Sequence, residues 1–263
     1  MDGIRLEGVH RVFPLEGGEV RALEDLSLRV PWGSLTAVVG RSGCGKTTLL
    51  RLVAGLDEPT AGRVRFLQGS EDLPREAVRV GLVFQEPRLM PWLSVEENLA
   101  FPLVGRLGRE EIRRRVDPLL ELLGLEGFRR ALPGQVSGGM AQRVALGRTL
   151  AHDPDVVLLD EPFGSLDYFT RRALQGEIGE LHRRTGKTFL LVTHDVDEAL
   201  ALGDSVVVLR QGRLADRVEV PFPRPRDVDD PVFAPLKRSV LGAIGGTTED
   251  PGRTKEEIGR AHV

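Results

Sequence analysis

The chain has 263 residues, of which 41% are hydrophobic and 29% are charged, and its formal net charge is −3. This balance argues against a dedicated nucleic-acid binder, which usually presents a basic surface, and the length allows one large domain or two small ones. Its single cysteine excludes an internal disulfide, and no apolar run approaches the about 20 residues of a membrane-spanning helix. We therefore expect a water-soluble, cytoplasmic protein that can dock on a membrane protein.

The N-terminal region alternates between apolar and polar residues. The clearest stretches are residues 4–9 and 22–30, and they predict antiparallel strands. The wholly apolar run 35–39 predicts a buried strand, and residues 48–54 predict a helix.

A phosphate-binding loop lies between that buried strand and that helix. Residues 40–48 fit the pattern G-x-x-x-x-G-K-[ST], in which glycines let backbone N–H groups point at phosphate oxygens. Lys46 can reach the β- and γ-phosphates, the Thr47 hydroxyl can bind Mg²⁺, and the helix N-terminus adds its positive dipole end. We therefore predict ATP and Mg²⁺ as cofactors, with nucleotide contacts from Gly40, Arg41, Ser42, Gly43, Cys44, Gly45, Lys46, Thr47 and Thr48.

The middle of the chain changes from strand to helix patterns. Residues 62–66 and 78–84 predict short strands, and the stretch from about 86 to 135 is rich in Arg, Glu and Leu, which is typical of helices with solvated charged faces. Further on, the apolar runs 156–159 and 189–192 predict strands of a parallel sheet with helices on both faces. A last strand is expected at 205–210.

Two acids end one of these strands. Asp160 and Glu161 follow the run 156–159, at the strand end where α/β sheets bind ligands. Asp160 is expected to hold Mg²⁺, and Glu161 to orient or deprotonate an attacking water. Such an acidic strand end is a weak signal alone, but together with the phosphate-binding loop it becomes a strong one.

A second glycine-rich sequence resembles a family signature. Residues 137–142 read Ser-Gly-Gly-Met-Ala-Gln before a helix pattern at 141–150, which is either a plain helix cap or a second anion-binding helix start. The run resembles the Leu-Ser-Gly-Gly-Gln signature of ABC transporter ATPases, with Val136 and Met140 as departures. Its place shortly before the acidic strand end is that of the family and favours the second alternative.

The resemblance extends over residues 2–215 and assigns further roles. Gln85 matches the family's Q-loop, residues 165–167 its D-loop, and His194 its switch histidine, while Phe13 stands where an aromatic side chain stacks on adenine. The resemblance implies a P-loop NTPase of the α/β class, with a mostly parallel core sheet, an N-terminal antiparallel β subdomain and a helical subdomain at about 86–150. The ATPase domain is expected at 1–218, followed by a Pro-rich extension at 219–263, weakly helical near 232–241 and disordered at its end.

The resemblance also implies a mechanism and partners. Two copies are expected to form a head-to-tail homodimer with ATP between the phosphate-binding loop of one and the signature of the other. Lys46, Glu161, His194 and Gln85 are the expected catalytic residues, and Thr47, Gln85 and Asp160 the expected metal ligands; Ser137, Gly138 and Gly139 complete the nucleotide site. Residues 87–103 are expected to dock an integral membrane permease, on the cytoplasmic side of the cell membrane.

Several stretches narrow the resemblance to one group of importers. Four stretches are similar to the corresponding stretches in importers of nitrate, aliphatic sulfonates and taurine: residues 83–98, 137–144, 160–171 and 223–227. Such importers also use a solute-binding protein. The alternatives are another importer, an exporter, or a soluble ABC ATPase of translation or DNA repair; one set of motifs without a long coiled coil disfavours the last. Lys46, Glu161 and His194 argue against a regulator without enzyme activity, and no nucleic-acid partner is expected.

Overall fold

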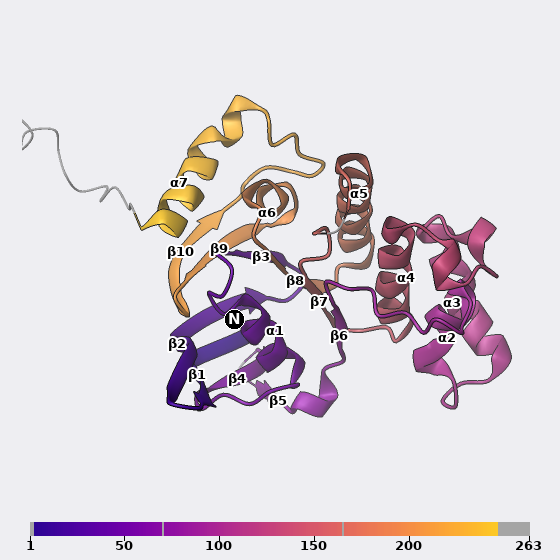
Figure 1. Ribbon diagram of the computed structural model, residues 1–263, viewed down its shortest axis with the longest axis horizontal. Coiled ribbons are helices and arrows are strands. Elements are labelled where there is room, and N and C mark those ends of the chain that lie inside the picture. Colours follow the sequence, from indigo (N-terminus) through magenta and orange to yellow (C-terminus); the bar gives the residue numbers. More distant parts are fainter. Residues whose placement is uncertain (1–2, 70, 165, 247–263) are drawn as a thin grey trace, which may run out of the picture.

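We describe a computed structural model of the protein that covers residues 3–69, 71–164 and 166–246. The first part of the chain forms an antiparallel sheet with the strand order β2-β1-β4-β5 (Figure 1). Its strands are β1 (Gly3–Leu15), β2 (Gly18–Pro31), β4 (Ala61–Gln68) and β5 (Glu71–Leu73). This is the expected N-terminal antiparallel subdomain, to which β5 is an addition that the sequence did not predict.

The second sheet positions the candidate site. Its order is β10-β9-β3-β8-β7-β6, and all pairs are parallel except that of β10 with β9. The strands are β3 (Leu35–Val39), β6 (Val80–Val83), β7 (Val156–Asp160), β8 (Thr188–Thr193), β9 (Ser205–Arg210) and β10 (Arg213–Glu219). Because parallel strands share one carboxyl edge, the segments that follow β3, β7 and β8 meet there.

Helices cover both faces of this sheet, and three more form a separate group at one end (Figure 1). The helices of the described chain are α1 (Lys46–Ala54), α2 (Val95–Ala100), α3 (Arg109–Leu122), α4 (Gly138–Ala151), α5 (Tyr168–Thr185), α6 (Val196–Leu202) and α7 (Ala234–Gly245). Short 3-10 turns lie at Arg75–Ala77, Phe101–Leu103, Glu126–Phe128, Pro133–Gln135 and Pro231–Phe233. No helix in the described ranges is long and apolar enough to cross a membrane.

Two hydrophobic cores lie on the two faces of the parallel sheet. In β8, Phe189 and Leu191 pack into the core shared with α2 to α7, whereas Leu190 and Val192 pack into the core shared with α1 and the antiparallel sheet. Successive side chains of a strand point to opposite faces. Burial on both faces therefore explains why β8 reads as a continuous apolar run.

The sequence and the structure differ mainly at element ends and beyond residue 160. The signature helix α4 begins at Gly138, three residues earlier than its apolar pattern predicted, because Ser137 caps it. Strand β6 ends at Val83, so that Gln85 follows the strand rather than ending it. Helices α5 and α6 and strand β10 had not been predicted. The boundary expected at 218 and the helical subdomain at about 86–150 stay predictions, and the tail 247–263 lies outside the described residues.

Candidate nucleotide-binding site

The phosphate-binding loop connects β3 to α1. Two of its glycines are required by close backbone packing: a Cβ on Gly40 would collide with the Leu209 carbonyl, and a Cβ on Gly45 with the Ala22 carbonyl. Gly45 also has a φ of 103°, a value that favours glycine. The sequence therefore forms this loop because only glycine fits both the space and the backbone angle.

Lys46 is the first residue of α1, where this loop ends. Its side chain is 5% exposed, and Nζ donates to the carbonyl oxygens of Gly40 at 2.8 Å and Arg41 at 3.2 Å. The Glu161 Oε1 atom lies 3.8 Å from Nζ. These contacts hold the ammonium group in place where a phosphate would meet it, and they compensate part of the cost of its burial.

Cys44 belongs to the same loop but has no catalytic environment. It is 6% exposed, and burial raises the pKa of its thiol. Because the thiolate is the reactive form, the side chain acts here as a small packing group.

Asp160 and Thr47 form a group of oxygen atoms suited to Mg²⁺. Asp160 ends β7, and its Oδ1 accepts a hydrogen bond from Thr47 Oγ1 at 3.3 Å. Burial raises the pKa of Asp160, which a bound cation would reverse. No group of three or more His, Cys, Asp or Glu in the described ranges could hold a metal. One carboxylate and one hydroxyl fit an ion that takes its remaining ligands from phosphates and water, as Mg²⁺ does.

Glu161 and His194 meet beside Lys46. His194 follows β8, and its Nδ1 donates to Glu161 Oε2 at 3.0 Å. Glu161 has a φ of 43°, and its backbone N–H donates to the Val192 carbonyl at 3.0 Å. A left-handed backbone at a residue other than glycine is strained. Here the strain turns the carboxylate toward both Lys46 and His194.

Gln85 shares a cavity of about 300 Å³ with Thr47 and Asp160. Helix α4 supports the segment around it: Gln142 Nε2 donates to the Phe84 carbonyl at 3.2 Å. Arg148 donates to the carbonyl oxygens of Pro87 and Arg88, both at 2.9 Å. The sequence did not predict roles for Gln142 and Arg148, because these side chains bond to residues about 60 positions away in the chain and so leave no local pattern.

Among the described residues, Ser137, Phe13 and Asp167 make their bonds and ring contacts outside this cluster. Ser137 caps α4 by accepting from the Met140 N–H at 3.2 Å, and Figure 1 shows α4 well separated from α1. Phe13 lies in β1, where the Arg11 guanidinium covers its ring at 4.4 Å from the centroid. In the D-loop, Asp167 caps α5, and Ser165 lies outside the described residues.

A glycine-rich loop between a buried strand and a helix, with two acids at the end of a second parallel strand of the same sheet, defines a P-loop nucleoside triphosphatase. Comparison with known proteins gives the family. Residues 23–164 match the ABC transporter family, which is more than half of the chain. The chain belongs to this family.

The relatives span almost the whole chain. An uncharacterized ABC transporter ATP-binding protein of Methanocaldococcus jannaschii is 44% identical, over 92% of this chain and 91% of its own length. A taurine import ATP-binding protein of a Jannaschia species is 42% identical, over 97% of this chain and 99% of its own length. An aliphatic sulfonates import ATP-binding protein of Burkholderia cenocepacia is 46% identical, over 86% of this chain and 83% of its own length.

Solved structures confirm the fold. A dimeric ATP-binding cassette in a post-hydrolysis state, bound to ADP and phosphate, aligns with a TM-score of 0.73 and 30% identity, covering 84% of this chain and all of that one. A subunit of an ABC transporter complex from Clostridium perfringens aligns with a TM-score of 0.76 and 28% identity, covering 94% of this chain and 98% of that one. The P-loop NTPase fold expected from the sequence is confirmed.

Proposed function

We propose that this chain is the ATP-hydrolysing subunit of an ABC importer and couples ATP turnover to solute uptake through a membrane permease. The observation that carries the proposal is the convergence of Lys46, Thr47, Asp160, Glu161 and His194 at one edge of the parallel sheet. The nucleotide would bring its phosphates to the loop around Lys46. A bound Mg²⁺ would neutralise charge that develops on the phosphates.

Each residue of the site has a distinct role in this proposal. Lys46 binds the β- and γ-phosphates, while Thr47, Asp160 and Gln85 hold the metal. Glu161 orients the attacking water and accepts its proton. His194, held by Glu161 at 3.0 Å, contacts the γ-phosphate. Phe13 stacks on adenine.

A second copy of the chain completes the site. The signature residues Ser137, Gly138 and Gly139 do not contact the phosphate-binding loop of their own chain among the described residues. In a head-to-tail homodimer they would donate to the γ-phosphate bound by the other copy. The dimeric cassette to which this chain is similar supports this arrangement.

Residues 87–103 are the proposed docking surface for the permease. Trp92 is 71% exposed and Phe101 48% exposed, and Val104 beside them is 65% exposed. Several exposed apolar side chains within one short segment, residues 92–104, favour a partner interface. Asn98 holds the segment from within: it is buried, accepts from the Met90 N–H and donates to the Met90 and Leu93 carbonyls. Arg148 binds the same segment at Pro87, which provides a path from the docking surface to Gln85.

The relatives favour taurine or another aliphatic sulfonate as the solute, and the sequence motifs add nitrate as an alternative. None of the described site residues contacts the solute in this proposal, because the solute passes through the permease. On the cytoplasmic membrane surface the subunit would be peripheral.

Reconstitution tests the proposal. The chain should copurify with the permease encoded beside its gene, and ATP turnover in proteoliposomes should rise when taurine and the cognate solute-binding protein are supplied. Trp92→Glu should abolish copurification while the isolated subunit keeps its ATPase activity. Leu214→Glu is the matched control, since Leu214 is 40% exposed on β10. Assembly of the Trp92→Glu variant with a solute-stimulated permease would place the docking surface elsewhere.

A further inference from the structure

Side chains of the C-terminal segment, residues 220–245, bond to the helix that follows His194 in the chain. Helix α6 is seven residues long and begins two residues after this histidine. Asp195 caps it by accepting from the Asp197 and Glu198 N–H groups at 2.8 and 3.3 Å. Thr193 Oγ1 donates to Glu198 Oε2 at 2.5 Å, from the residue before His194. A displacement of α6 would therefore move the backbone of His194.

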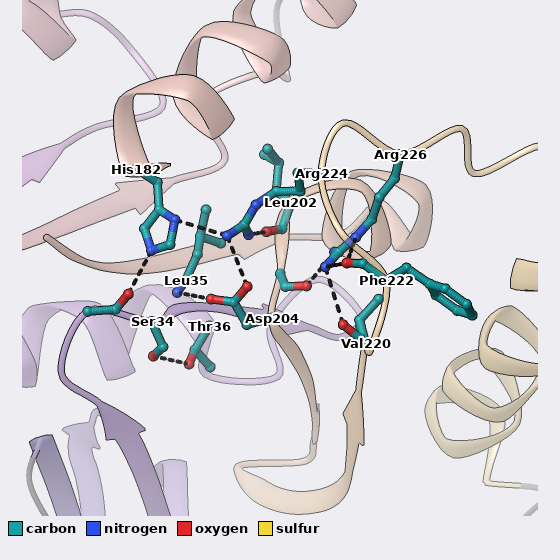
Figure 2. Close-up of polar contacts among 12 residues, drawn as sticks. Ser34, Leu35, Thr36, His182, Leu202, Asp204, Val220, Phe222, Arg224 and Arg226 are labelled. Carbon is teal, nitrogen blue, oxygen red and sulfur yellow. Dashed lines mark hydrogen bonds and ion pairs between the residues drawn. The ribbon is translucent and has the colours of Figure 1, made fainter. Parts of the chain in front are cut away.

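Arg226 holds the C-terminal end of α6. Its guanidinium donates to the carbonyl oxygens of Leu200 at 2.8 Å and Gly203 at 2.6 Å, groups that a helix end leaves without partners. The same guanidinium donates to Phe222 at 2.6 Å and Val220 at 3.3 Å within its own segment (Figure 2). Burial, together with the nearby Arg224 cation, lowers the pKa of Arg226 to about 10.

Arg224 makes a second attachment at the same end. It donates to the Leu202 carbonyl and to His182 Nδ1 at 3.0 Å, and it pairs with Asp204 at 2.9 Å (Figure 2). His182 is then the Nε2–H tautomer, because Nε2 lies 2.9 Å from the Gly33 carbonyl. Asp204 also accepts from the Leu35 N–H at 2.8 Å. The end of α6 is thereby tied to α5 and to the start of β3.

Lys237 of α7 holds the other end. Its Nζ donates to Asp197 Oδ2 at 2.9 Å and lies 2.7 Å from Oδ1, in the first turn of α6. Helix α7 is itself anchored, since Val240 and Ala243 belong to the main core. Figure 1 shows α7 lying across β10 and β9 beside α6.

We infer that residues 220–245 form a clamp on both ends of α6 that positions His194 for the γ-phosphate. Arg226 and Lys237 are positioning residues in this inference, because they act through α6 and do not touch the nucleotide. The inference depends on the role proposed for His194. Loss of the bonds of Arg226 and Lys237 should lower kcat and leave the KM for ATP nearly unchanged, since the printed partners of these two side chains lie in α6, at Gly203 and at residues 220–222, away from the phosphate-binding loop.

The test compares two lysines, each of which pairs with an aspartate at 2.7 Å. Lys237→Met removes the contact to α6, whereas Lys187→Met removes a pair of the same length, 2.7 Å, with Asp153. Lys237→Met should lower kcat about 3- to 10-fold, a modest loss because the pair is half exposed. Lys237→Arg should restore kcat, and Lys187→Met should leave it unchanged. Arg226→Met should lower kcat more, measured on protein shown by circular dichroism to be folded.

A double-variant cycle assigns the effect to His194. In a His194→Ala background, Lys237→Met should have no further effect on kcat, because the group that the clamp positions is gone. Additive losses would overturn the clamp while leaving the role of His194 intact. Equal kcat for Lys237→Met and Lys187→Met would also overturn it. An unchanged kcat in His194→Ala alone would instead overturn the proposed role of His194, and the clamp with it.

Discussion

The chain contains two glycine-rich helix starts, and their surroundings differ. Helix α1 begins at a buried lysine, with Thr47, Asp160 and Glu161 close by, and its N-cap Gly45 has no capping side chain. Helix α4 is capped by Ser137, and a Cβ on Gly138 would meet no atom within 4 Å. The first start therefore has charged groups and the proposed metal ligands beside it, whereas the second has open space around Gly138.

This difference indicates a division of labour. A helix N-terminus attracts anions, but in the described part of the chain the charged groups proposed to bind the triphosphate and to activate water lie around α1. One chain thus holds the chemistry, and a second copy would add donors to the face of the nucleotide that α1 leaves open.

The largest expected effect is that of Glu161→Gln. Hydrolysis should fall by a factor on the order of 10² or more, because the positioned base is lost. ATP binding should persist, and the variant should form a stable dimer with ATP that gel filtration detects. Turnover of the variant at the wild-type rate would show that Glu161 is not the base.

Gly138→Glu tests the second helix start. The open space around Gly138 should accommodate the side chain, and an acid in the first turn of a helix is favourable for folding. The new charge should repel the γ-phosphate of the other copy and lower hydrolysis about 10-fold or more, which corresponds to about 1.4 kcal/mol. ATP binding to the monomer should be unchanged.

Gly127→Glu is the matched control, because a Cβ on Gly127 also meets no atom within 4 Å. Equal ATPase rates for the two glutamate variants would contradict the proposed dimer.

Phe13→Ala should weaken ATP binding by about 1–3 kcal/mol, the range for stacking of a base on an aromatic ring. Turnover at saturating ATP should stay close to that of the wild type, since Phe13 does not contact the catalytic cluster. Phe13→Tyr should keep the affinity. Titration with a fluorescent ATP analogue measures it. Unchanged affinity in a folded Phe13→Ala variant would mean that the ring only packs in the antiparallel sheet.

The smallest effect concerns stability against pH. The pKa of Glu198 is raised to about 7, because burial, together with the nearby Asp195 carboxylate, outweighs the opposing effects of Thr193, Arg171 and His194. The folded chain therefore binds this proton more tightly than the unfolded chain, for which the pKa is about 4.3. The contribution to stability is present below that value and is lost as the pH rises toward 7.

Glu198→Gln keeps an acceptor for Thr193 and removes the titration. The melting temperature of the wild type should fall relative to that of this variant by a few degrees between pH 5 and pH 8. Parallel melting curves of the two proteins would argue that Glu198 does not titrate in this window.

Much of the fold was predictable from the sequence, and the misses have physical causes. The buried strands β3, β7, β8 and β9 were found within one residue at each end, because burial on both faces produces unbroken apolar runs. Helix α5 was missed although Leu174, Ile178 and Leu181 have helical spacing. Its glycines, Gly176 and Gly179, weaken the intrinsic preference for helix, and packing against the core overrides it.

By itself, the sequence determined which residues could carry the chemistry. The phosphate-binding loop is local, and the acids and His194 follow buried strands, so that motif order and parallel pairing suffice to bring them together. Only the tertiary structure decided how these residues are held. The strained backbone of Glu161, the bonds from Arg148 to the segment of Gln85 and the grip of Arg226 on α6 join distant parts of the chain. Such contacts depend on how the elements pack, and no local pattern in the sequence encodes them.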